Sequence, residues 1–186
     1  MAENPVWKVY SITKLEAAKR QIETAVTLWF NEGDAVSTHT LISAAHRVVH
    51  DVAESKGLPG AFLVDSKRLE EWGYDAKTYK KAIRSAETFF KHAANDPEGT
   101  HEFSDIITAT IFASTIDCNK RLKGNMTPLM RFFRFWFDLA NTPLDSVGLS
   151  EQVGAPTVHL IKVAQTVPRF TFFDLFSNIF LKPPDV

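Results

Sequence analysis

The sequence has very little cysteine: Cys118 stands alone among 186 residues. A single cysteine excludes an internal disulfide and a cysteine-based zinc finger, and it fits a reducing compartment. No uncharged apolar run approaches the roughly 20 residues that span a bilayer, so we expect no membrane partner. The opening MAENPVWKVYS has no basic segment followed by an apolar stretch. We therefore expect no secretory signal and a cytoplasmic protein.

An excess of charge of either sign is also missing. The formal net charge is −1 at pH 7, so the field of the whole molecule does not favour nucleic acid, and an anion site would have to be a local patch. Apolar residues make up 45% of the chain and charged residues 23%, a balance that predicts a globular fold instead of disorder. The length fits one helical domain, residues 1–186, with residues 142–186 as a C-terminal helical appendage.

Glycine and proline gather between segments in which apolar residues recur at helical spacing, and this predicts an all-α fold. Thr13 and Glu16 have the spacing of a capping box, and Ser37 is predicted to cap the second helix. Thr127 followed by Pro128 predicts another helix start. Long helices are predicted at residues 11–31, 38–56, 76–94, 105–122 and 128–140. A short helix or turn is predicted at 66–73, and short C-terminal helices at 155–167 and 171–181.

Strand evidence is weak and is limited to VWKVY near the N-terminus and AFLVD at residues 61–65. The connections between the predicted helices are short, which favours antiparallel neighbours. The expected architecture is a helical bundle of four to five long helices with short C-terminal helices beside it.

Three of the six histidines, His39, His46 and His50, fall inside one predicted helix. At helical spacing they lie within about 20° of one line, together with Ser43. We expect this stripe at the border between an aliphatic face and a polar arc. The aliphatic residues are Leu41, Ala45, Val48 and Val52, and the polar ones are Thr40, Arg47, Asp51 and Glu54. Border histidines can form hydrogen bonds to a neighbouring helix, ligate a metal, or serve as acid, base or phosphate contact.

A metal site is the weaker alternative. His46 and His50 are one turn apart, about 6 Å, which suits a pair of zinc ligands. A third ligand would have to come from another helix, from His92 or His101. The glutamate of an H-E-x-x-H motif is missing, which excludes that metalloprotease motif. Because the His46 and His50 pair has no third ligand nearby in the sequence and is better placed for packing, we expect no bound metal, and we expect no cofactor.

A second cluster lies in AIRSAETFFKHAANDP. Five polar residues fall within about 40° on one face of the predicted helix, with His92 beside them. They are Lys77, Lys81, Arg84, Thr88 and Lys91. A basic stripe beside an imidazole is able to position a phosphodiester and move a proton. A solvated outer face of an amphipathic helix is the alternative interpretation.

Arg84 followed by His92 late in a helix resembles the motif of the HEPN superfamily, an Arg, four to six residues and a His. In this chain seven residues separate the two, and Ser85 stands where an Asn is typical. The resemblance covers residues 11–140. It implies a helical dimer that cuts RNA without metal, in a toxin–antitoxin or antiphage context, although some members only bind. Residues 37–57 together with FFKHA also resemble a group of uncharacterised bacterial helical proteins, which implies no activity.

Aromatic residues are concentrated near the C-terminus. The segment PLMRFFRFWFDLA places Arg131 and Arg134 among aromatic residues, a pattern that can stack on nucleic-acid bases. We favour the alternative, a buried core helix in which Asp138 pairs with Arg134. The tail RFTFFDLFSNIFLKPP is predicted to put one apolar side on the bundle or on a partner subunit. That side comprises Phe172, Leu175, Phe176, Ile179 and Phe180.

Two main hypotheses follow. In the first, the protein acts on or binds RNA; the expected catalytic residues are His92, Arg84, Lys91 and His50, with His46 as a possible helper. In the second it is a non-enzymatic binding or assembly protein, a homodimer through the Phe-rich tail. Convergence of His92 and the histidine stripe on one open cleft would favour the enzyme, and histidines buried against their own partners would favour the binder.

Overall fold

The computed structural model describes residues 7–60, 75–92, 96–143 and 155–181, and within these segments it contains helices and no strand. The all-α prediction is confirmed. The helices are α1 (Lys14–Phe30), α2 (Ala35–Ser55), α4 (Ala76–Lys91), α5 (Asp105–Arg121), α6 (Pro128–Ala140), α8 (Ala155–Thr166), α9 (Arg169–Phe176) and α10 (Asn178–Leu181). Residues 7–10 of the VWKVY segment form no strand. The predictions for AFLVD and for residues 66–73 lie outside the described residues, as does the predicted end of the third helix at 93 and 94.

Helix starts follow local capping chemistry. The side chains of Thr13, Asp75 and Thr127 each accept a hydrogen bond from the backbone N–H three residues later, at 2.6–3.3 Å. The prediction that Ser37 caps the second helix is wrong. The carboxylate of Asp34 accepts the N–H of Ser37 at 2.6 Å, so α2 begins at Ala35. Aspartate caps a helix as well as serine does. Asp34 is the N-cap because the backbone is already helical from Ala35 onward.

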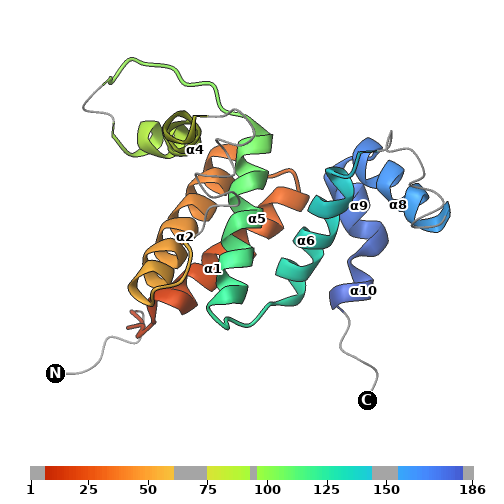
Figure 1. The fold of residues 1–186 in the computed structure, drawn as a ribbon, viewed down its shortest axis with the longest axis horizontal. Coiled ribbons are helices and arrows are strands. Elements are labelled where there is room, and N and C mark those ends of the chain that lie inside the picture. The colour runs from red at the N-terminus through yellow and green to blue at the C-terminus, as the bar shows by residue number, and fades with distance from the viewer. Residues whose placement is uncertain (1–6, 61–74, 93–95, 144–154, 182–186) are drawn as a thin grey trace.

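The helices are arranged as an array with α4 at one end and α8 to α10 at the other (Figure 1). The antiparallel pair α1 and α2 packs against α5, α6 packs against α1 and α5, and α4 packs on α2. Of the described helices, none is long and apolar enough to cross a bilayer.

The core is built largely from aromatic rings on α1, α5 and α6. Phe30 is fully buried, and its ring centroid lies 4.9 Å from that of Phe132 and 5.7 Å from that of Trp136. Phe133 is also fully buried. The core interpretation of the PLMRFFRFWFDLA helix is therefore confirmed. Arg134 extends to the surface, where it forms an ion pair with the predicted partner Asp138 at 2.9 Å.

The C-terminal helices share this core. Phe173 stacks on Phe30 with ring centroids 5.4 Å apart, and Phe172 is fully buried. Arg169 at the start of α9 lies 4.0 Å above the Trp29 ring and pairs with Asp105 at 2.7 Å, which ties α9 to both α1 and α5. The segment 155–181 is thus packed against the bundle.

The apolar side predicted for this tail is only partly correct. Phe172 is buried, and Phe180 packs on Phe132 with ring centroids 5.5 Å apart, but Leu175 and Ile179 are exposed. The predicted single helix is interrupted at Ser177, where α9 ends and α10 begins. In one continuous helix Ile179 would fall within about 20° of Phe172, and the interruption turns it outward. A homodimer through this segment stays a prediction.

Candidate functional site

The most strongly charged element is α4, which carries five cationic side chains and one carboxylate in its 16 residues. Ile83 and Ala86 are buried and fix the helix on the body of the protein. Lysines and an arginine occupy the outward side because the residues recur at intervals of three and four. Four of them line a surface hollow of about 380 Å³ and define what we term the α4 basic patch: Lys77, Lys80, Lys81 and Arg84.

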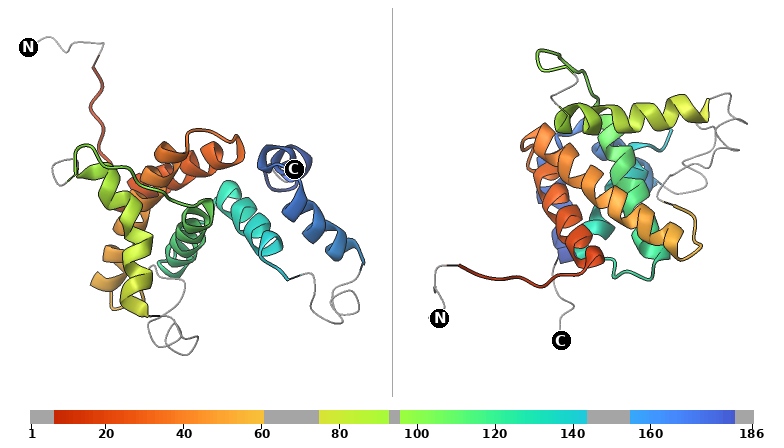
Figure 2. Two further views of the ribbon diagram at one scale, coloured as in Figure 1. Left: turned by 90° about the horizontal axis from the view of Figure 1, so that it is seen from above. Right: turned by 90° about the vertical axis from the view of Figure 1, so that its left-hand side faces the viewer.

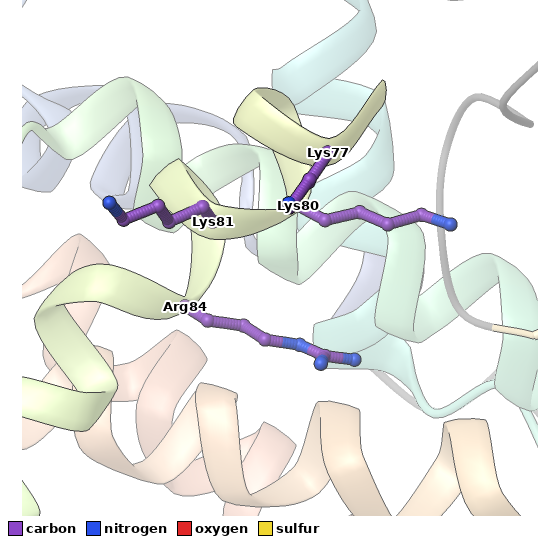
Figure 3. Close-up of a pocket in the computed structure, with 4 residues that line it drawn as sticks. All are labelled: Lys77, Lys80, Lys81 and Arg84. Atoms are coloured by element: carbon purple, nitrogen blue, oxygen red, sulfur yellow. The ribbon is translucent and has the colours of Figure 1, made fainter. Parts of the chain in front are cut away.

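Figure 3 shows how the patch is spread. Lys80 and Arg84 leave the helix in the same direction, and Lys81 extends the opposite way. The patch therefore offers charge over a surface and not at one point. The predicted basic stripe contained Lys77, Lys81 and Arg84 but not Lys80. Lys80 stands three residues after Lys77 and four before Arg84, and this spacing was the available signal.

The two predicted site residues at the end of α4 have other surroundings. Lys91 forms an ion pair with Glu87, with 2.5 Å between Nζ and Oε1. His92 is the C-cap residue, where its backbone N–H donates to the carbonyl of Thr88 at 3.1 Å, and its side chain is exposed. Arg84 lies eight residues earlier, about 12 Å along the axis and roughly 80° around it. Within one chain, helical geometry keeps Arg84 and His92 on different faces.

The histidine stripe is buried, so its predicted position at a border is wrong. His39, His46 and His50 are all less than a tenth exposed. The reason is tertiary: α2 packs on α1 along one side and on α4 and α5 along others, so more than its aliphatic face is covered. The periodicity of a single helix predicts one buried face, so it does not predict that a second face is covered by other helices.

His39 is a buried residue that contacts α5. Its Nδ1 lies 2.9 Å from the hydroxyl oxygen of Thr108 on α5, and its ring packs against Phe90 and Phe103. Burial lowers the pKa of His39, Glu87 opposes this shift, and the positive form of His101 adds to it. His39 is therefore neutral at pH 7 and serves as a hydrogen-bonded core residue that joins α2 to α5.

His46 and His50 form a second group. Their rings are parallel, with an interplanar angle of 2° and centroids 6.1 Å apart, and the Nε2 of His50 lies 3.3 Å from Glu54. The backbone of Gly60 covers His50 so closely that a Cβ atom there would lie 2.2 Å from Nδ1. The carbonyl of Gly60 accepts a hydrogen bond from Arg121 at 2.8 Å, which holds this cover in place.

The histidines do not gather into one cluster. His50 lies eleven residues after His39, which is about 16 Å along α2. His92 is two residues from Phe90, whose ring packs on His39, so His92 lies near the His39 end of the stripe and away from His50. His101, the other proposed third metal ligand, stacks on Phe89 with ring centroids 5.3 Å apart. In the segments that the structure describes, no group of three or more His, Cys, Asp or Glu side chains is placed to hold a metal ion.

The thiol of Cys118 is buried, and burial raises its pKa. It approaches the carbonyls of Val49 and Pro59 at 3.8 and 3.9 Å. We expect a thiol reagent such as Ellman's reagent to label the native protein far more slowly than the urea-unfolded protein, because only unfolding exposes a thiolate. Absorbance of the released chromophore measures both rates. Labelling of the native protein at the unfolded rate would contradict this burial.

The described surface thus carries a basic patch on α4, and the stripe histidines lie inside the protein. No protein-family model, no curated protein sequence and no solved structure matches the chain. Its function is accordingly inferred from the chemistry of the patch and from the surroundings of the histidines.

Proposed function

We propose that this protein is an RNA-binding helical protein that contacts the phosphate backbone through the α4 basic patch. The observation that carries the proposal is the joint lining of one surface hollow by Lys77, Lys80, Lys81 and Arg84. The chain as a whole has a net charge of −1, so this local concentration of positive charge is a departure from the rest of the molecule. The resemblance to the HEPN superfamily, which includes non-catalytic binders as well as ribonucleases, agrees with it.

The dimensions of the patch suit a nucleic-acid backbone. Lys77 and Arg84 are about 10 Å apart along the helix axis, enough to contact more than one phosphate. Contacts to phosphate position a protein on nucleic acid but carry no sequence information. We therefore expect binding that depends strongly on salt and weakly on sequence.

The positions of the histidines favour RNA binding over RNA cleavage. General acid–base catalysis needs a proton donor or acceptor within hydrogen-bond reach of the reacting group. His39 is buried in a hydrogen bond, the ring of His50 is covered by Gly60, and His92 stands about 12 Å along α4 from Arg84. None of these positions supports cutting a strand held at the patch.

The test is fluorescence anisotropy with a labelled single-stranded RNA of about 16 nucleotides, titrated at several salt concentrations. Lys80→Gln combined with Arg84→Gln should weaken binding roughly ten-fold or more at low salt and reduce the slope of log K against log[salt] by about 1.4, since each lost phosphate contact contributes about 0.7. Circular dichroism checks that the variant retains its helix content.

The matched control is Lys120→Gln combined with Lys162→Gln, which removes two exposed charges on α5 and α8, outside the patch. Its slope should stay close to that of the unmodified protein. Equal weakening by both pairs, or no binding at low salt, would refute the proposal. Shortening of the RNA that disappears in His92→Ala would instead support the ribonuclease hypothesis.

A further inference from the structure

Residues 7–12, which we term the N-terminal arm, are the most exposed apolar segment described. Val9 is 100% exposed, Trp7 78% and Tyr10 72%. The arm has no helix or strand, and Figure 2 shows it leading away from the helices. Large apolar side chains that are clustered and uncovered mark a surface that another surface covers.

A groove that fits such a segment lies between α1 and α2. It has a volume of about 470 Å³; its apolar lining residues are Ala17, Val48 and Val52, and its charged ones are Lys14 and the ion pair of Arg47 with Asp51. Gln21 also lines the groove, and its Oε1 is buried without a hydrogen-bond partner in the described structure. An indole N–H or a backbone N–H of an inserted segment would satisfy this acceptor.

We infer that two copies of this chain form a dimer in which the N-terminal arm of each copy docks in the α1–α2 groove of the other. The arm spans about 20 Å when extended, and the groove runs about 10 Å along α1 from Lys14 to Gln21, so the arm is long enough to fill it. Apolar side chains of the arm match Ala17, Val48 and Val52 in the groove lining.

The geometry at the root of the arm favours a second copy over the arm's own groove. Thr13 is extended (φ −79°, ψ 160°), and its side chain is held by the N–H of Glu16, so the chain enters α1 from outside the body. The groove begins at Lys14, directly after this cap. An arm that filled its own groove would have to reverse within one or two residues. If a two-fold axis passes beside Lys14, each arm enters the partner's groove without reversing its chain direction, and the two contacts are equivalent, as in an isologous dimer.

Cysteine cross-linking tests the exchange, because the native Cys118 is buried. Chains carrying Val9→Cys and chains carrying Val48→Cys, with different tags, are co-expressed and mildly oxidised. A disulfide requires Cα atoms within about 7 Å, so the expected product is a disulfide-linked dimer that carries both tags. The control pairs Val9→Cys with Ile106→Cys. Ile106 is exposed at the start of α5, near Thr108 and His39 and thus at the end of α2 remote from the groove.

Two further measurements complete the test. A chain carrying both Val9→Cys and Val48→Cys should form disulfide-linked dimers; a disulfide-closed monomer would mean that the arm fills its own groove and would overturn the inference. Trp7→Ala combined with Val9→Ala should shift the native mass from dimer to monomer while the melting temperature of the helices changes little. Cross-linking no greater than in the control pair, or a monomeric unmodified protein, would also overturn it. RNA binding plays no part in these readouts.

Discussion

Replacement of Phe30 with alanine is expected to lower the free energy of unfolding by about 3–5 kcal/mol. The side chain is fully buried and meets rings from two other helices, at 4.9 Å to Phe132 on α6 and 5.4 Å to Phe173 on α9. The alanine variant loses the transfer free energy of the ring and leaves a cavity whose walls cannot fully collapse. Urea denaturation followed by circular dichroism measures the change, provided that the transition remains two-state.

Phe170→Ala is the matched control, because Phe170 lies on α9 but is 52% exposed. Its effect should be within about 0.5 kcal/mol. If Phe30→Ala cost no more than this control, Phe30 would not lie in a packed aromatic core. If it produced two separate transitions, α8 to α10 would be a separate folding unit.

Acid is expected to destabilise the protein through His39. Burial holds the pKa of His39 below the ordinary value of 6.5 in the folded state, so at mildly acidic pH the unfolded chain binds more protons than the folded one. The contribution of His39 is therefore constant above pH 6.5 and declines as the pH falls from 6.5 towards the lower folded pKa. Glu87 opposes the shift, and the positive form of His101 reinforces it.

His39→Leu separates this effect from ordinary packing. At about pH 8 the variant should lose about 1–3 kcal/mol, since the Thr108 hydroxyl is left buried without its imidazole partner. Its stability should then fall less than that of the unmodified protein between about pH 7 and about pH 5, because leucine cannot bind a proton. Urea midpoints across this range provide the measurement. Parallel pH profiles for the two proteins would rule out His39 as the buried group that titrates.

The sequence predicted the local features of this fold well. Thr13 and Thr127 were expected as helix starts from their own side-chain chemistry, and each caps a helix. Asp34 was missed in favour of Ser37 because both residues are good caps and only the backbone decides between them. Lys80 was missed although its spacing to Lys77 and Arg84 is visible in the sequence.

The features that failed depend on tertiary contacts. The burial of His39, His46 and His50 follows from the packing of α2 against several helices, which periodicity along one helix does not encode. The exposure of Ile179 follows from the interruption at Ser177, where no glycine or proline marks a stop. The surroundings of His92 depend on the exact end of α4, and helix ends are the least certain feature of any sequence prediction.

The stacking of Phe173 on Phe30 has a consequence for biosynthesis. The two rings belong to helices near opposite ends of the chain, so this contact is among those of highest sequence separation. A ribosome presents α1 long before it presents α9, and during that interval Phe30 lacks one of the rings that cover it. Nascent chains that still lack α9 therefore expose aromatic surface, and such transient apolar exposure favours aggregation before synthesis is complete.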